Sequence, residues 1–324
     1  MALLNFFIRR LPELTLLLSA VALSCGVGPG STNADLPVEA EPQPGELVFK
    51  EDEELQRRFA EIAEGAQGKV GIHVMLIEEN RSVSFNGNER FAMQSVVKLP
   101  VAMAVLRMVS DGEIKLDDKI EFSKDELVNP NQRSPLRDKG PNGGSATVDE
   151  LMRLAVSESD GTACDVLTRV AGGPAGLQAY IDGLGISEIK APRTHKEFGR
   201  DWAMQYENWA TPEAAVKLLE GIYHSEGGLQ GQGELLRKYM TEGPTGMNRL
   251  KGMLPAGTPV AHKTGTGGTR DGVTSATNDV GIITLPNGKH IAIAVFVGDS
   301  RADEETREAV IARMAKAAWD TWNK

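Results

Sequence analysis

Three short motifs follow one another along this chain of 324 residues: Ser95-Val-Val-Lys98, Ser159-Asp160-Gly161 and Lys263-Thr264-Gly265. A serine hydroxyl is a weak nucleophile at neutral pH, so a site that uses one needs a proton acceptor within hydrogen-bond reach. Lys98 meets this need because residues three apart on a helix share a face. The motifs therefore predict a serine nucleophile with its proton shuttles, beside a cationic, hydroxyl-rich wall that suits an anion.

Two other segments carry similar letters, namely Ser187-Glu-Ile-Lys190 and Ser110-Asp-Gly112. Ser187 follows a glycine-broken turn in a stretch compatible with a strand, where side chains three apart point to opposite faces. Ser95 instead opens an apolar helical run that ends at Gly112. Ser110 lies near the far end of that run, roughly 22 Å from Ser95 at about 1.5 Å per residue. We therefore select Ser95 and Ser159 for the site.

Hydrophobic periodicity predicts the elements that must position these motifs. Helical spacing predicts amphipathic helices at 55–62 and 304–319, and strand signals occur at 69–77, 81–85, 259–263, 279–285 and 290–297. Only helical patterns and loops are expected between the second strand and about residue 245. Strands at both ends of the chain predict an α/β fold of the α+β type, in which a five-stranded antiparallel sheet is flanked by terminal helices and carries an inserted all-helical domain.

The domain boundaries follow from the same pattern. Residues 51–90 and 245–324 are expected to form a discontinuous α/β domain, and residues 91–244 the helical domain. Ser95 begins the first helix after the sheet, and Lys263 lies at the end of a strand. The site is therefore expected in the crevice between the two lobes.

The N-terminal region reads as a targeting segment. Residues 1–25 join two arginines to a short apolar run, which is typical of a secretory signal peptide and too short for an ordinary transmembrane span. Ala22-Leu-Ser-Cys25 resembles a bacterial lipoprotein cleavage site that would leave Cys25 lipidated, whereas cleavage after Ala22 is the alternative. Residues 26–50 are rich in Gly, Pro and acids and are expected to form a flexible linker. We expect export to the periplasm or the extracellular space, with membrane anchoring through Cys25 as one of two outcomes.

Composition excludes several classes of function. The net charge of −10 argues against nucleic-acid binding, which needs basic patches. The five histidines show no metal-ligand spacing, so we expect no metal and no other cofactor. Of the two cysteines, Cys164 has no partner if Cys25 is lipidated or removed; a buried small hydrophobe is favoured there over a reactive thiol. We expect a monomer.

The trio of motifs resembles that of the class A serine β-lactamases, within the superfamily that includes the penicillin-binding proteins. Further segments resemble the extended-spectrum subgroup, namely 91–98, 134–138, 205–209, 261–266 and 277–290. The resemblance runs from about residue 50 to the C-terminus. It implies the family's fold and hydrolysis of the β-lactam amide through a serine acyl-enzyme without a cofactor. The implied substrates are β-lactam antibiotics, and the implied consequence is resistance to them.

The resemblance also implies roles for individual residues. Ser95 attacks the lactam carbonyl, and the backbone N–H groups of Ser95 and Thr266 form an oxyanion hole whose donors are typically worth about 3–4 kcal/mol each. Lys98 takes or relays the serine proton, Ser159 passes it to the lactam nitrogen, and Lys263 completes the catalytic set. The residues implied to bind substrate are Thr264, Gly265, Thr266, Arg249, Gly161 and Arg133.

Three of these positions need comment. Gly161 replaces the asparagine of the family's S-D-N motif, so the amide that holds the substrate's acylamino carbonyl is missing. Arg133 stands where an aromatic residue usually flanks the entrance. Arg249 matches a position from which some members reach the substrate carboxylate, and a surface ion pair is the alternative.

Deacylation separates a lactamase from a penicillin-binding protein, because the acyl-enzyme is hydrolysed only if a base activates water. The candidate is Glu197, in the region that resembles the family's Ω-loop, with a solvated loop acid as the alternative and Asp201 as the next candidate base. Two functions therefore remain open beside the lactamase: a D-Ala-D-Ala peptidase of the penicillin-binding protein type, and a non-hydrolytic penicillin sensor. A sensor needs a transmembrane helix and a cytoplasmic output module, and the sequence suggests neither.

Overall fold

The computed structural model describes residues 44–324, and from Gln43 onward the chain forms one compact unit. The predicted signal peptide, Cys25 and most of the predicted linker lie outside the described residues. Within the described part, no helix combines the length and the apolar character that crossing a membrane requires.

A central antiparallel sheet forms the spine of this unit. Its strand order is β2-β1-β11-β10-β8, and the short strand β9 pairs with β10 as a sixth member. Strand bounds are β1 Lys69–Leu76, β2 Arg81–Phe85, β8 Val260–Thr266, β9 Thr269–Arg270, β10 Val273–Thr284 and β11 His290–Ser300. Strands from both ends of the chain therefore pair side by side, as in the register that joins His73 to Ala294.

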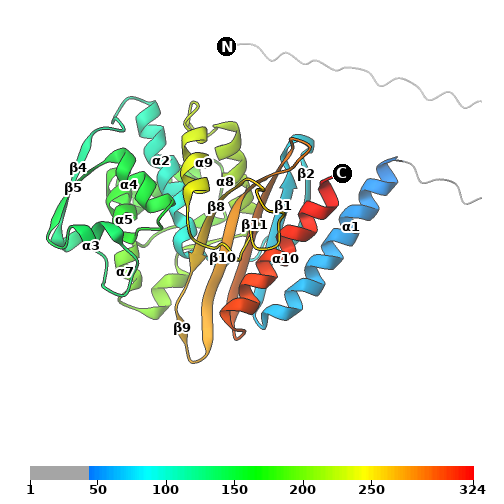
Figure 1. Cartoon of the computed structure of the whole chain (residues 1–324). Helices are drawn as coiled ribbons and strands as arrows, with labels where there is room; N and C mark the ends of the chain where they lie inside the picture. Colours follow the sequence, from blue (N-terminus) through cyan, green and yellow to red (C-terminus); the bar gives the residue numbers. More distant parts are fainter. Residues whose placement is uncertain (1–43) are drawn as a thin grey trace, which may run out of the picture. The chain divides into compact units, whose positions relative to one another are not determined.

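The two terminal helices cover one face of the sheet. α1 (Pro44–Ala63) and α10 (Glu304–Trp322) lie together on that face (Figure 1). Apolar side chains of α1 such as Leu55 and Phe59 pack with Ile311 and Met314 of α10 and with Ile293 of the sheet, all of them buried. This core packs the helix pair onto the sheet.

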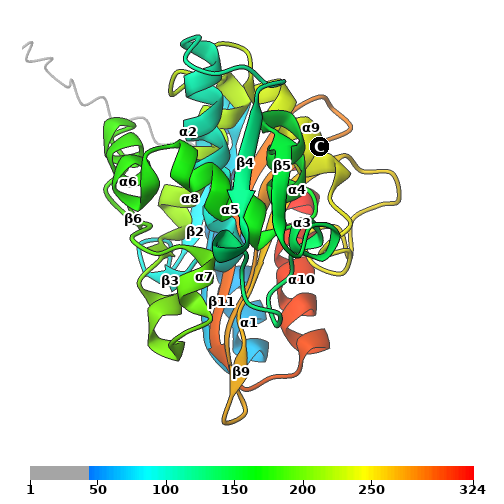
Figure 2. The same cartoon turned by 90° about the vertical axis from the view of Figure 1, so that its left-hand side faces the viewer.

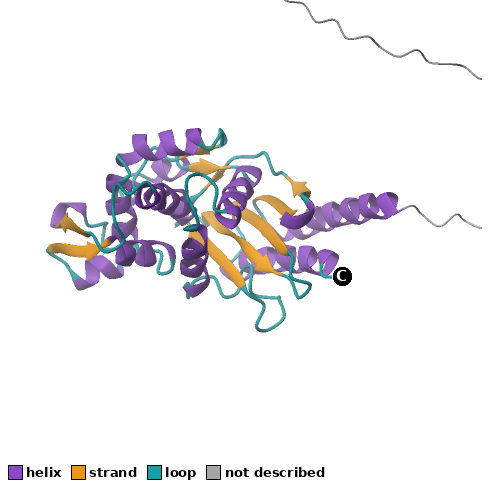
Figure 3. Ribbon diagram, turned by 90° about the horizontal axis from the view of Figure 1, so that it is seen from above, coloured by secondary structure: helices purple, strands orange, loops and turns teal. Residues whose placement is uncertain are grey.

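The opposite face carries the long helical insertion (Figure 2), and the view from above shows helices on both sides of the strands (Figure 3). A second core joins Val105 of α2, Leu151 of α4 and Leu167 of α5 to Ala292 and Phe296 of the sheet. The helices of the insertion are α2 Lys98–Ser110, α3 Pro135–Lys139, α4 Val148–Val156, α5 Gly161–Val170, α6 Gly173–Gly183, α7 His195–Phe198, α8 Pro212–His224 and α9 Gly233–Glu242. The predicted architecture of sheet, terminal helices and helical insertion is confirmed, whereas the division into two domains stays a prediction.

Some local expectations are wrong. The insertion is not free of strands: it contains β3 Phe91–Ala92, β4 Lys119–Ser123, β5 Gly143–Thr147, β6 Ile189–Lys190 and β7 Trp209–Ala210. Strands of two residues are too short to carry an alternating pattern, and β4 and β5 pair across a long loop. Residues 44–50 belong to α1 in the structure, where the sequence predicted part of a flexible linker.

Candidate active site

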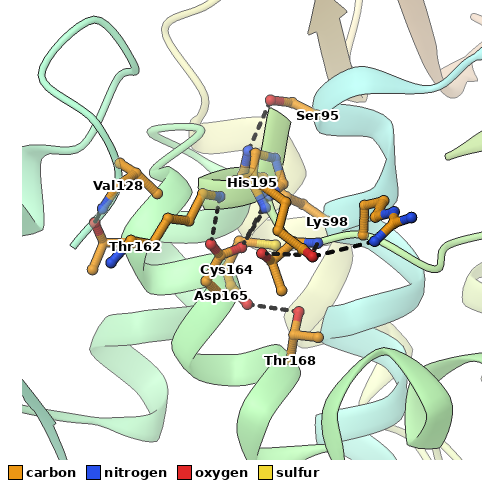
Figure 4. Close-up of polar contacts among 12 residues, drawn as sticks. Ser95, Lys98, Val128, Thr162, Cys164, Asp165, Thr168 and His195 are labelled. Carbon is orange, nitrogen blue, oxygen red and sulfur yellow. Dashed lines mark hydrogen bonds and ion pairs between the residues drawn. The ribbon is translucent and has the colours of Figure 1, made fainter. Parts of the chain in front are cut away.

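The proposed nucleophile lies where the sheet meets the insertion. Ser95 belongs to the short 3-10 turn η3 (Gln94–Val97), which runs directly into α2. The Lys98 Nζ atom donates a hydrogen bond of 2.8 Å to Ser95 Oγ (Figure 4). The spacing of three residues therefore brings the two side chains together as expected. Gln94, at φ 49°, is in the left-handed region, and its amide donates to Gln205 Oε1 at 2.8 Å, which fixes the turn that presents Ser95.

Lys98 is held away from water. Only 1% of its surface is exposed. Burial lowers the pKa of Lys98 below its ordinary range, because the charged ammonium loses hydration, while the nearby acidic groups of Asp165 and Asp160 oppose the shift. A lysine with a lowered pKa can accept the proton of Ser95 near neutral pH.

A second hydroxyl and a second buried lysine form the opposite wall. Lys263 Nζ donates to Ser159 Oγ at 3.0 Å and to the Thr264 carbonyl at 3.0 Å. Ser159, at φ 57°, lies in the left-handed region, and the buried carboxylate of Asp160 holds its loop by accepting from Ser134 Oγ at 2.8 Å and Leu136 N at 2.6 Å. Burial, and next the charge of Lys98, lower the pKa of Lys263 well below its ordinary value. The site thus holds two serine–lysine pairs.

A cleft of about 630 Å³ separates these pairs. Ser95, Lys98, Ser159, Thr264 and Thr266 all line it, so residues from three distant segments converge on one space. Gly265 lies between two of them on β8, where an added Cβ would come within 2.5 Å of the Met93 carbonyl oxygen. A glycine is therefore required for the strand to approach the turn that carries Ser95.

Arg249 also lines the cleft, but most of its donors are already engaged. Its guanidinium donates to Glu308 Oε1 at 2.9 Å, to the carbonyls of Gly265 at 3.3 Å and Asn278 at 3.0 Å, and to Thr266 Oγ1 at 2.9 Å. A guanidinium has five N–H donors, so one Nη2 hydrogen remains for a ligand. The group that was expected to reach a carboxylate mainly fixes the strand carrying Thr266.

Gly161 and Arg133 lie on the rim of the same cleft. The Gly161 N–H donates to the Arg133 carbonyl at 2.9 Å, which joins the two positions. The Arg133 guanidinium, about half exposed, donates to the Glu158 carbonyl at 2.5 Å and to its carboxylate at 2.7 Å. The Arg133 side chain is therefore an ion-paired group at the position where the resemblance placed an entrance-flanking residue.

The structure places the Glu197 carboxylate on the start of α7, and its role as a base stays a prediction. Its carboxylate accepts from Thr194 N at 2.8 Å and Thr194 Oγ1 at 3.1 Å, and it pairs with Arg193 at 3.4 Å. This is a capping box at the start of α7, and it satisfies free backbone donors of the helix. Glu197 is not among the described residues that line the cleft, and Asp201, which does line it, caps the next turn by accepting from Ala203 N at 3.0 Å.

His195 occupies the cleft wall instead. It is 8% exposed, and its Nε2 atom lies 2.7 Å from Lys98 Nζ. The sequence contained a signal for this arrangement: Thr194-His-Lys-Glu197 has the letters of a capping box, which commits Glu197 to the helix start. Residues two apart on a helix do not share a face, so His195 points elsewhere.

The two similar segments, 187–190 and 110–112, contribute no residue to the cleft lining. The exposed Ser187 hydroxyl donates to Glu188 at 3.5 Å, while Lys190 pairs with Asp182 at 3.4 Å. Ser110 Oγ donates to the Leu229 carbonyl at 2.9 Å near the far end of α2.

One group in the described part of the chain has the composition of a metal site. Ligand atoms of Cys164, Asp165 and His195 all lie within 4.8 Å of one another. Burial raises the pKa of the Cys164 thiol to about 12, which disfavours the thiolate that a metal ion would need. The Asp165 carboxylate already accepts two backbone N–H groups, and the ammonium of Lys98 faces His195. The chemistry of this set favours a hydrogen-bonded network over a cation.

Comparisons with known proteins agree with this geometry. The model of a family described as the β-lactamase enzyme family matches residues 54–322. The extended-spectrum β-lactamase PER-1 of Pseudomonas aeruginosa is 37% identical over 265 residues, which cover 82% of this chain and 86% of the relative.

Solved structures give the same result. A β-lactamase from Chitinophaga pinensis is 43% identical, with a TM-score of 0.80 over 82% of this chain and 98% of the other. A representative class A β-lactamase from Bacteroides cellulosilyticus is 32% identical, with a TM-score of 0.79 over 84% of this chain and 98% of the other.

Proposed function

The chain belongs to the β-lactamase enzyme family, in its class A, and we propose that it hydrolyses the amide bond of the β-lactam ring through an acyl-enzyme on Ser95. The observation that carries this proposal is the 2.8 Å hydrogen bond between Ser95 Oγ and Lys98 Nζ, in a lysine whose pKa is lowered by burial. A hydroxyl and its proton acceptor are thus already in contact.

In the acylation step, Ser95 Oγ attacks the lactam carbonyl carbon while its proton passes to Lys98. The negative charge that develops on the carbonyl oxygen is assigned to the backbone N–H groups of Ser95 and Thr266, both of which line the cleft. The carbon–nitrogen bond then breaks, and Ser159 protonates the departing nitrogen with Lys263 as its donor at 3.0 Å. An ester on Ser95 remains.

Binding of the substrate carboxylate is assigned to the wall formed by Thr264, Gly265 and Thr266, with the remaining Arg249 hydrogen beside it. The Thr245 and Thr264 hydroxyls share a hydrogen bond of 3.0 Å at this wall. Hydroxyl groups beside the positive charges of Lys263 and Arg249 suit an anion. Gly161 and Arg133 are assigned to the contacts with the substrate's side chain at the rim.

The proposal is tested with purified full-length protein and nitrocefin. Steady hydrolysis of many equivalents is expected, with loss of hydrolysis in Ser95→Ala. A burst of one equivalent followed by no further reaction would instead indicate a penicillin-binding protein of the D-Ala-D-Ala peptidase type. That second function is favoured by one observation, the placement of the Glu197 carboxylate on the helix cap.

Export and anchoring complete the proposal. We assign export to residues 1–25, with a lipid on Cys25 as the anchor and the stretch after it as the tether. Cell fractionation tests the anchor: activity in the membrane fraction should move to the soluble fraction in Cys25→Ser. Soluble activity in both forms would indicate cleavage after Ala22.

A further inference from the structure

His195 is held in one orientation by contacts from two other segments. Its backbone N–H and that of Lys196 donate to the Asp165 carboxylate of α5 at 2.7 Å and 2.8 Å. The Gln132 amide donates to the His195 carbonyl at 2.5 Å. α7 has only four residues, so these outside contacts, rather than its own hydrogen bonds, fix the side chain toward the cleft.

The ring of His195 lies between a carboxylate and the reacting serine. Its Nδ1 atom is 3.4 Å from Asp165 Oδ1, and its Nε2 atom is 2.7 Å from Lys98 Nζ, which in turn reaches Ser95 Oγ (Figure 4). The carboxylate favours the tautomer that carries its proton on Nδ1. The lone pair of Nε2 then faces the cleft, on the side of Lys98 and Ser95.

The charge state of this ring also suits a base. Burial, and next the positive charge of Lys98, lower the pKa of His195, while Asp165 acts in the opposite direction and Lys263 adds a smaller lowering effect. The imidazole is therefore neutral at neutral pH and can accept a proton. The Cys164 thiol beside it remains protonated and does not compete for that role.

We propose that His195 is the general base of deacylation, taking a proton at Nε2 from the water that hydrolyses the ester on Ser95. This inference rests on the proposed function, because it concerns the second half of the same reaction. It assigns to an imidazole the task that sequence reasoning gave to the carboxylate of Glu197. Asp165 is a positioning residue that holds the ring and its tautomer.

The step balances as follows. Water attacks the ester carbonyl carbon, its proton passes to His195 Nε2, and a tetrahedral intermediate forms. The intermediate collapses with cleavage of the bond between the carbonyl carbon and Ser95 Oγ. A proton then returns to Ser95 through Lys98, which lies within hydrogen-bond distance of both groups. A neutral imidazole has one lone pair, so Nε2 must exchange the N–H of Lys98 for the water O–H before the attack.

Four proteins test the proposal by intact-protein mass spectrometry with benzylpenicillin. Ring opening releases no leaving group, so the acyl-enzyme carries the full mass of the antibiotic. His195→Gln removes the proton acceptor but keeps a group that can bond Lys98, and it should accumulate the acyl-enzyme with deacylation slowed by about 10²- to 10⁴-fold. Glu197→Gln keeps a capping-box residue and should turn over without accumulation. His224→Gln, at the exposed end of α8, controls for loss of a histidine and should match the unaltered enzyme.

A second measurement needs no variant and covers the case in which His195→Gln fails to fold. The deacylation rate constant of the unaltered enzyme should fall on an acid limb whose midpoint lies below the ordinary pKa of an imidazole, because burial lowers the pKa of His195 and the protonated ring cannot accept a proton. Ionisation of an imidazole is strongly temperature-dependent and that of a carboxylate is nearly independent, so the midpoint of this acid limb should move to lower pH on warming. A stationary midpoint would overturn the proposal in favour of a carboxylate base.

The outcomes separate the two proposals. Turnover of His195→Gln at the unaltered rate, or trapping in Glu197→Gln, would overturn the role of His195 while leaving β-lactam hydrolysis intact. Trapping of the unaltered enzyme itself would refute both turnover and the base, but would keep Ser95 as the acylated residue. No mass increase together with no consumption of benzylpenicillin by the unaltered enzyme would refute the proposed function as a whole.

Discussion

Replacing Gly161 with asparagine should restore a contact that the family pattern predicts and this chain lacks. Gly161 is the first residue of α5 and lines the cleft. A Cβ atom at this position would lie 3.3 Å and 3.4 Å from the two methyl groups of the buried Val128, and 3.5 Å from the Arg133 carbonyl oxygen. The side chain therefore fits if Val128 moves by a few tenths of an ångström, and its amide can reach the cleft.

The magnitude follows from the hydrogen bond that is gained. A neutral hydrogen bond contributes about 0.5–1.5 kcal/mol net, which corresponds to a gain of about 2- to 13-fold in kcat/KM. The displacement of Val128 acts against this gain, so Gly161→Ala is the matched control that adds the same Cβ without the amide. The ratio of Asn to Ala then isolates the hydrogen bond.

The assay compares kcat/KM for benzylpenicillin, which carries an acylamino side chain, with 6-aminopenicillanic acid, which does not. Because kcat/KM reports the steps up to acylation, the comparison does not depend on which residue activates the hydrolytic water. The ratio of Asn to Ala should rise for benzylpenicillin alone. An equal rise for both substrates, or a rise already present in Gly161→Ala, would refute the placement of the missing donor.

Three further results are expected. Ser187→Ala should retain full activity in the nitrocefin assay whereas Ser95→Ala has none, because Ser95, unlike Ser187, is hydrogen-bonded to a buried lysine. Activity lost in Ser187→Ala would show that the wrong motif was selected. Arg249→Ala should lower the free energy of unfolding by about 3 kcal/mol, which is the lower end of the range for breaking a buried ion pair, and Glu308→Gln should lower it by less. An unchanged melting temperature together with a raised KM would instead favour an arginine that only binds substrate. The free energy of unfolding measured in urea should fall as pH drops below 6.5, because burial lowers the pKa of His73 and the unfolded chain binds the proton more readily. His73→Gln should reduce the slope of the unfolding free energy against pH by at most about 1.4 kcal/mol per pH unit. An unaltered slope would exclude His73 as its source.

The parts of the site that sequence could predict are those set by local spacing. Ser95 and Lys98 meet because a helical turn brings positions three apart onto one face. The long strands were predicted because each carries a run of apolar or alternating residues. These signals lie within a few neighbouring positions, so they can be read without knowing how the rest of the chain folds.

The parts that sequence could not predict depend on partners far along the chain. The Arg249 guanidinium is held by hydrogen bonds to Glu308 and to carbonyls on β8 and β10, none of them near it in sequence. The side of α7 that faces the cleft is decided by Asp165, thirty residues earlier. A motif match places this turn near the site, but Glu197 and His195 point in different directions from it. Contacts with distant segments determine which of the two side chains faces the cleft.

An imidazole rather than a carboxylate at position 195 also affects the acylation half of the reaction. The cleft already buries the amino groups of Lys98 and Lys263, and a neutral histidine adds no negative charge that would favour their charged forms. Burial therefore keeps the pKa of Lys98 low, which favours the neutral amine that takes the Ser95 proton. His195→Glu would bring a carboxylate next to Lys98, raise its pKa and retain the charged form. We expect that variant to deacylate, because a carboxylate can accept the water proton, but to acylate more slowly at neutral pH and to regain acylation as pH rises. An acylation rate equal to that of the unaltered enzyme across the neutral range would show that Lys98 does not act as the proton acceptor of Ser95.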